Sequence, residues 1–200
     1  MERVAVALIA VLAVAVGGVF VAVEARDGPD RPPVAASSGS HGHMDTQLAE
    51  SEADFLTGMV AHHEEAVVAA AELARSDRAE MRELGELIVE SQTRQIRTMQ
   101  RWLARWYPDA GPAPYHPMMR DLSDLSGDAL DRTFLEDMVG HHMVAVMSSQ
   151  HLVMAGGDGH REVAALARDI VEDQRAEIHL MSDWLADWFG VHGHASMGHG

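Results

Sequence analysis

The sequence predicts an all-α protein: a four-helix bundle made of two copies of one helical hairpin and preceded by an N-terminal transmembrane or signal helix. Three features support this prediction: the composition, an apolar run at the N-terminus and an internal repeat. Hydrophobic residues make up 47% of the 200 residues, but aromatic residues only 5%. Ala, Leu, Val and Met supply most of the apolar content, a mixture that favours helices over sheets.

Charge and residue usage narrow the function classes. Lys and Arg number 15 against 31 Asp and Glu, which gives a formal net charge of −16 at pH 7. This balance lacks the basic footprint of a nucleic-acid-binding protein, so we expect no nucleic-acid partner. Cysteine is absent, which excludes disulfides and thiolate metal sites. Histidine and methionine each occur 13 times, and histidine enrichment indicates metal binding.

The N-terminal segment predicts export. Val4 to Val23 carries no charge and follows Arg3, so residues 1–25 are predicted to be a signal peptide or a membrane anchor. Both alternatives stay open, and the membrane is a partner only if the segment is not cleaved. The basic residue before the run places everything after it outside the cytoplasm. Residues 26–50 are rich in Pro, Gly and Ser and are predicted to be a disordered tether.

An internal repeat organises the rest of the chain. The pattern of residues 55–73 recurs at 134–152 with a constant offset of 79, and that of residues 88–106 recurs at 170–188 with an offset of 82. The three extra residues fit a longer turn around Gly156 and Gly159 in the second copy. A repeat of this length predicts two related helical hairpins.

The hairpin boundaries follow from turn and capping signals. We predict a bundle over residues 51–190, consisting of a hairpin at 51–108, a linker at 109–127 and a hairpin at 128–190, followed by a His- and Met-rich tail at 191–200. Ser51 and Asp54 have the spacing of a helix N-cap, Ser76-Asp77 opens the second helix, and Gly190 ends the last one. An alternative is a homodimer in which the two hairpins exchange partners.

Polar residues interrupt the apolar stripes of these helices at equivalent places. A His-His pair follows a Met by three and four residues in each copy, and the partner helices carry Gln or Glu within their stripes. Buried polar groups need partners. A bound metal ion, a hydrogen-bonded polar layer and acid/base catalysis are the three explanations, and we favour the metal because His is the commonest metal ligand. The residues are His62, His63, His141 and His142, with Gln92, Gln95, Gln174 and Glu177 opposite them.

Segments outside the predicted helices add soft ligands. Imidazole and thioether donors without thiolates match Cu(I), and they also accept Cu(II) or Zn(II). The donors cannot be explained by packing, because tether, linker and tail residues do not build a core. They are His41, His43 and Met44 in the tether, His116, Met118 and Met119 in the linker, and His192, His194, Met197 and His199 in the tail.

The motif Phe-Leu-x-x-Met-Val-x-His-His-x-x-Ala-Val, followed by Ile-x-x-x-Gln-x-x-Gln/Glu-Ile-x-x-Met-x-x-Trp-Leu, resembles the bacterial domain of unknown function 305 family. The resemblance covers Phe55 to Trp106 and Phe134 to Trp188. It implies an exported, ferritin-like four-helix bundle, with some members binding copper and supporting copper resistance. It also implies that Met59 and Met138 join the four His as ligands, with Met99 and Met181 nearby.

These observations lead to one leading hypothesis and two alternatives. The leading one is a non-enzymatic, extracytoplasmic protein that sequesters copper or passes it between an unknown donor and acceptor. The first alternative is a metal-free structural or adaptor bundle. The second is a ferritin-like di-iron or di-manganese oxidase, which the sequence disfavours because no Glu-x-x-His motif occurs.

Overall fold

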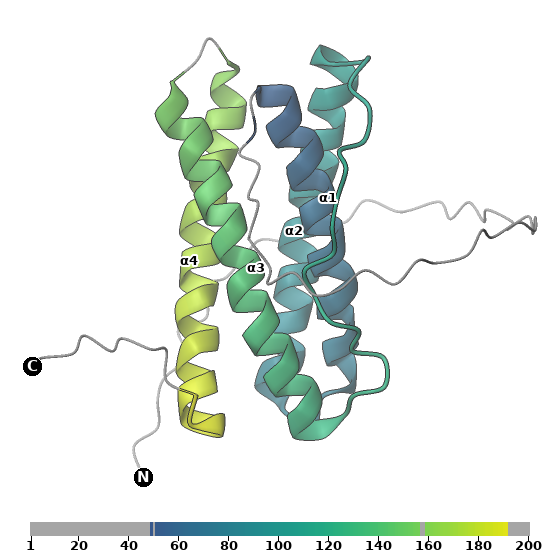
Figure 1. Cartoon of the computed structure of the whole chain (residues 1–200), viewed down its shortest axis with the longest axis vertical. Coiled ribbons are helices and arrows are strands. Elements are labelled where there is room, and N and C mark those ends of the chain that lie inside the picture. The colour runs from purple at the N-terminus through teal and green to yellow at the C-terminus, as the bar shows by residue number, and fades with distance from the viewer. Residues whose placement is uncertain (1–48, 50, 157–158, 192–200) are drawn as a thin grey trace, which may run out of the picture. The chain divides into compact units, whose positions relative to one another are not determined.

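The computed structural model describes residue 49, residues 51–156 and residues 159–191, and these form an all-α unit without a β-strand in the described ranges. Four long helices build a helical bundle, as the sequence predicts (Figure 1). They are α1 (Glu52–Ala71), α2 (Ala79–Trp106), α3 (Gly127–Ala155) and α4 (Arg161–Phe189), and a 3₁₀ turn, η1 (Glu72–Arg75), follows α1.

The predicted signal or anchor helix at residues 1–25 lies outside the described residues, as do most of the tether and the tail from residue 192 onward. None of the helices that the structure describes is apolar over a length sufficient to cross a membrane.

The helices pair as two hairpins, α1 with α2 and α3 with α4, and the hairpins meet mainly through α1 and α3. Figure 1 shows the connection after α2 running the length of the bundle before α3 begins at the other end. α1 and α3 are therefore antiparallel. Both hairpins come from one chain, so no exchange of helices between chains is needed to complete the bundle.

Local signals set the helix ends. The Ser51 hydroxyl accepts a hydrogen bond from the Asp54 N–H (3.1 Å), as the capping spacing predicts. Gly190 ends α4 in the left-handed conformation with φ of 66°. The prediction that Ser76-Asp77 opens α2 is wrong, because the N-cap is Arg78. Ser76 instead ends η1, and its hydroxyl accepts from the Arg78 N–H (3.1 Å).

Two buried apolar clusters fill the bundle, one on either side of the two His-His pairs. One cluster contains Phe55 and Met59, which precede the first pair, and Ala145, which follows the second pair. The other contains Ala66, which follows the first pair, and Met138, which precedes the second. Because α1 and α3 are antiparallel, the four His form a polar layer between the clusters, here called the histidine layer (His62, His63, His141 and His142).

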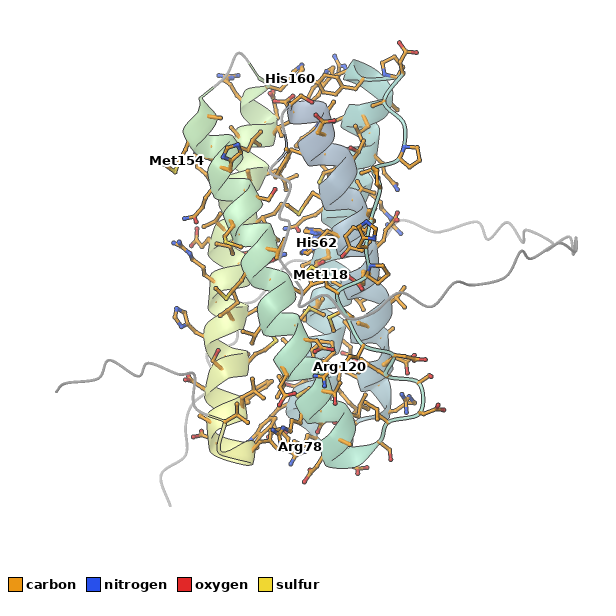
Figure 2. The ribbon with its side chains drawn as sticks, in the orientation of Figure 1. His62, Arg78, Met118, Arg120, Met154 and His160 are labelled. Atoms are coloured by element: carbon orange, nitrogen blue, oxygen red, sulfur yellow. The ribbon has the colours of Figure 1, made fainter. Side chains whose placement is uncertain are left out.

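A polar clasp joins the hairpins at each end of the bundle. The Arg78 guanidinium donates to the fully buried Asp131 carboxylate (2.6 Å) and also pairs with Asp128. At the other end, His160 lies 2.6 Å from the Glu52 carboxylate through its Nδ1. Figure 2 shows Arg78 and His160 at opposite ends.

Candidate metal centre

The histidine layer lies where α1 and α3 pack together, near the middle of the bundle (Figure 2). His62 is 5% exposed, and the other three side chains are completely buried. The His62 and His141 rings stack, with centroids 3.6 Å apart and planes 12° apart. His63 and His142 flank this stack, at 6.3 Å from His62 and 6.2 Å from His141 between ring centroids. The two pairs thus converge, as the internal repeat predicts.

The two imidazoles that flank the stack, those of His63 and His142, contact side chains of α2 and α4. His63 Nε2 lies 2.7 Å from Gln95 Oε1 on α2, and His142 Nε2 lies 2.5 Å from Glu177 Oε2 on α4. Both partners are acceptor oxygens, so each Nε2 carries the proton and each Nδ1 keeps a lone pair. Neither Nδ1 has a hydrogen-bond partner. A metal-binding histidine is commonly held in this way, with one nitrogen donating to an oxygen and the other free to bind the ion.

The central two imidazoles contact the linker. Tyr115 places its hydroxyl 3.3 Å from His62 Nδ1 and 3.5 Å from His141 Nε2, and it donates to the Glu65 carboxylate. His141 Nε2 is also 3.3 Å from Glu65 Oε2, whereas His141 Nδ1 has no partner. His62 Nε2 donates to the His141 carbonyl oxygen (3.1 Å). Three of the four imidazoles therefore present an unpartnered, buried Nδ1.

Glu65 fastens the linker over this side of the layer. Its Oε1 accepts from the backbone N–H groups of Met118 (2.8 Å) and Met119 (2.9 Å), while Oε2 faces Tyr115 and His141. The His-Pro-Met-Met segment of the linker is thereby fixed beside the histidine layer, and Figure 2 shows Met118 close to His62. These hydrogen bonds explain why a Pro-rich segment keeps a defined position.

Burial keeps three of the imidazoles, those of His62, His63 and His141, neutral at pH 7. Desolvation lowers the pKa of His63 to about 3, and it also lowers the pKa values of His62 and His141, aided by repulsion between neighbouring imidazoles. Partial burial opposes ionisation of Glu65, but hydrogen bonds from His141, Tyr115 and the Met119 N–H outweigh it and lower its pKa to about 2. At neutral pH these three imidazoles offer unprotonated nitrogens and the Glu65 carboxylate lies beside them, which is the state that a cation requires.

Most of the unpaired buried polar atoms of the described residues belong to the histidine layer or to two glutamines, one on α2 and one on α4. Gln92 and Gln174 are nearly completely buried, at 2% and 3% exposed, and neither amide group has a hydrogen-bond partner. Together with the three free Nδ1 atoms they account for all such side-chain atoms except Asp131 Oδ1 and Ser149 Oγ. An unpaired buried polar group costs roughly 1–3 kcal/mol, so the three free Nδ1 atoms destabilise the fold if the layer is purely structural.

The predicted thioether ligands lie in the two clusters beside the layer. Met59 and Met99 share one cluster, and Met138 and Met181 share the other. All four are buried, with exposed fractions between 0 and 4%. Each hairpin therefore contributes two thioethers near its own His-His pair, on opposite sides of the layer.

No group of three or more His, Asp or Glu side chains in the described part of the chain is arranged to hold a metal ion. The stacking of His62 on His141 explains this, because ring nitrogens bind in the plane of the ring and parallel rings do not aim at one point. Each hairpin carries an imidazole with a free Nδ1 and two buried thioethers, and these are donor types that Cu(I) accepts. Met side chains are flexible enough to approach an ion.

The sequence pattern singled out the four His with their Gln and Glu neighbours, and the family resemblance added the four Met, but both missed Glu65 and Tyr115. The role of the His and Met as ligands stays a prediction. Glu65 lies three residues after His62 and so on the same face of α1, which is the signal that could have found it. Tyr115 has no sequence signal apart from being an aromatic residue in a Pro-rich linker. The predicted ligands His192, His194, Met197 and His199 lie outside the described residues, as do His41, His43 and Met44.

The fold and the site define a class: a helical bundle with a buried histidine layer flanked by methionines. Residues 52–185 match the family model described as Domain of unknown function (DUF305). The chain belongs to this family. No curated protein sequence gives a significant match.

Solved structures of the family are similar over most of their length. CopM in the Cu(I)-bound form is 29% identical with a TM-score of 0.62, over 71% of this chain and 100% of that one. A DUF305 protein from Streptomyces coelicolor is 29% identical with a TM-score of 0.64, over 73% of this chain and 98% of that one. A DUF305 fragment from Deinococcus radiodurans is 34% identical with a TM-score of 0.60, over 70% of this chain and 97% of that one.

Proposed function

We propose that the protein binds copper outside the cytoplasm and sequesters it or passes it on, without catalysing a reaction. The bundle holds the ion through the histidine layer and the adjacent methionines, and the His- and Met-rich terminal segments exchange it with partners. A ferritin-like arrangement, with one long crossover between the hairpins, suits this role because ligands from facing helices project into the bundle.

One observation carries the proposal: three buried imidazoles each have an unpaired Nδ1 while Nε2 donates to an oxygen. A hydrogen-bonded structural layer would use both nitrogens. A metal-binding layer leaves one nitrogen free and uses the other to orient the ring. His63 with Met59 and Met99, and His142 with Met138 and Met181, are the ligand sets that we propose for the two hairpins.

The choice of copper rests on ligand type and on relatives. Thioether and imidazole donors in the absence of thiolates select Cu(I) over Mg²⁺ or Ca²⁺, which prefer oxygen. CopM, at 29% identity, has been solved with Cu(I), and it has also been solved with Cu(II) and silver. Zinc and iron fit the donor set less well, since the sulfur donors are soft and no Glu-x-x-His pair is present.

The location outside the cytoplasm rests on the charge-free segment Val4 to Val23, which follows Arg3. The Streptomyces coelicolor relative is described as a secreted protein. A cleaved signal and a retained membrane anchor remain the two forms of this prediction. Mass spectrometry of the protein recovered from its host distinguishes them by the mass of the N-terminus.

An anaerobic Cu(I) titration of the full chain against a competing chelator tests the function. The variant His62→Leu, His63→Leu, His141→Leu and His142→Leu should lose the tightest binding by more than about 100-fold, because residues that bind the ion contribute more than residues that only orient them. Leucine fills the space of the removed rings, but Gln95 and Glu177 lose their hydrogen-bond partners, so circular dichroism is needed to check that the variant folds.

His179→Leu is the matched control, because His179 is exposed on α4. Its Cu(I) affinity should equal that of the parent. Repeating both titrations with His192, His194, Met197 and His199 replaced by Ala separates the bundle from the tail. If the four-Leu variant keeps the parent affinity in that background, the layer is a structural element and the metal-free bundle is the better description.

A further inference from the structure

The outward face of α3 carries a second group of soft donors, separate from the histidine layer. Met147 and Met154 are 40% and 85% exposed, and His151 is also exposed. Figure 2 shows Met154 pointing away from the bundle. Methionine is among the residues most often buried, so core packing does not explain why two of them lie beside an exposed histidine.

The spacing brings the three side chains together. Positions i, i+4 and i+7 of an α-helix fall within an arc of about 60°, so Met147, His151 and Met154 line one face. His151 is one turn from each methionine, and Cβ atoms one turn apart are roughly 5–6 Å from each other. Both thioethers can therefore approach the imidazole. Met143, which is 50% exposed on the same face, is two turns from His151 and too far away to share an ion with it.

The first hairpin has no such group. The positions 79 residues earlier are Val68, Glu72 and Arg75, and none of them is a soft donor. The donors on α3 are therefore not a by-product of the internal repeat. They occur in one hairpin only, on a surface that packing leaves free.

From this juxtaposition we propose that Met147, His151 and Met154 form a surface site for a soft monovalent cation, Cu(I) or Ag(I). Two thioethers and one imidazole give a three-coordinate S₂N set, which suits such ions and not Mg²⁺ or Ca²⁺. The negative net charge of the chain attracts cations to its surface. Because the site is exposed, it exchanges its ion more readily than the buried layer. The site does not depend on the proposed role of that layer.

Ag(I), which is stable in air, serves as the probe with the full chain labelled with ¹³C at the methionine methyl groups. We expect the methyl signals of Met147 and Met154 to shift as Ag(I) is added. Met147→Leu combined with His151→Gln and Met154→Leu should bind one Ag(I) fewer than the parent. These positions are exposed and the substitutes favour helix, so folding should not change.

Met143→Leu is the matched control, because it removes an exposed thioether from the same face but not from the site. Its Ag(I) stoichiometry should equal that of the parent. Unshifted Met147 and Met154 signals, or an equal loss in the Met143 variant, would overturn the proposal. In the four-Leu variant of the histidine layer the shifts should persist, which separates failure of this site from failure of the buried one.

Discussion

The two ends of the bundle are closed by related clasps that differ in their base and in their acid. At one end Arg78 pairs with Asp131, and its guanidinium lies 4.9 Å from the centre of the Trp188 ring. At the other end His160 pairs with Glu52, and its ring stacks on Trp106 at 3.6 Å.

The positions of the two clasps correspond through the offsets of the repeat, 79 for the acids and 82 for the bases and aromatics. In each clasp the base is the N-cap residue of an even-numbered helix and reaches an acid in the other hairpin. The two clasps share this arrangement, and we expect the strength of their pairing to differ. Arg78 is always charged, and its partner Asp131 is fully buried. His160 is a weaker base than arginine, and its side chain is 37% exposed.

The largest expected effect is the removal of the arginine clasp. Arg78→Ala leaves the Asp131 carboxylate buried without a cation, which should lower the free energy of unfolding by about 4 kcal/mol. His160→Ala should cost only about 1 kcal/mol, since Glu52 keeps its hydrogen bond from the Tyr107 hydroxyl. Urea unfolding of both variants measures the difference. Equal losses would mean that the two clasps are energetically equivalent.

The histidine layer should make the free energy of unfolding depend on pH. Burial lowers the pKa of His63 to about 3 in the folded, metal-free protein, whereas the unfolded chain protonates this residue near pH 6.5. The resulting stability is complete above pH 6.5 and is lost as pH falls toward 3, because the unfolded state binds more protons. His63 alone should account for roughly 3 kcal/mol between pH 7 and pH 4. In His63→Leu the pH dependence measured by urea unfolding should be flatter by this amount; an unchanged slope would contradict neutral burial.

A smaller effect should come from the helix contact in each hairpin. A Cβ at Gly85 would lie 2.7 Å from the Ala70 carbonyl oxygen and 2.9 Å from the Leu73 Cβ, so Gly85→Ala should cost about 2 kcal/mol through overpacking. The second hairpin has Ala167 at the corresponding position, completely buried. Ala167→Gly should cost only about 1 kcal/mol through helix propensity. Thermal unfolding compares the two, and a harmless Gly85→Ala would show that α1 and α2 can separate at no cost.

The smallest effect concerns the partners of His63 and His142. Glu177 supports His142 with a carboxylate, whereas Gln95 supports His63 with a neutral amide. A carboxylate partner makes the imidazole a better ligand. Glu177→Gln should therefore weaken Cu(I) binding by about tenfold, and Gln95→Glu should strengthen it. Competitive Cu(I) titration checks both variants. If both substitutions changed the Cu(I) affinity in the same direction, the carboxylate partner would not make His142 the better ligand.

Much of this structure could be predicted from periodicity and capping. The four helices, the Ser51 cap and the Gly190 stop follow from local sequence, and the interruptions at Gln95 and Glu177 identified the groups that meet the imidazoles. The clasps could not be found in this way, because Arg78 and Asp131 become neighbours only once the hairpins pack antiparallel. Tyr115 was missed because the path of the linker follows no periodicity, whereas Glu65 lies three residues after His62 on α1 and could have been found from that spacing.

The central claim is that copper enters the bundle and binds the histidine layer. Crystals of the full chain grown anaerobically with Cu(I), with anomalous diffraction recorded at the copper edge, would locate the ion directly. We predict a peak between the helices within bonding distance of His63 or His142 Nδ1, with a methionine sulfur beside it. Copper found only on the surface or at the terminal segments, with the layer empty, would contradict the claim.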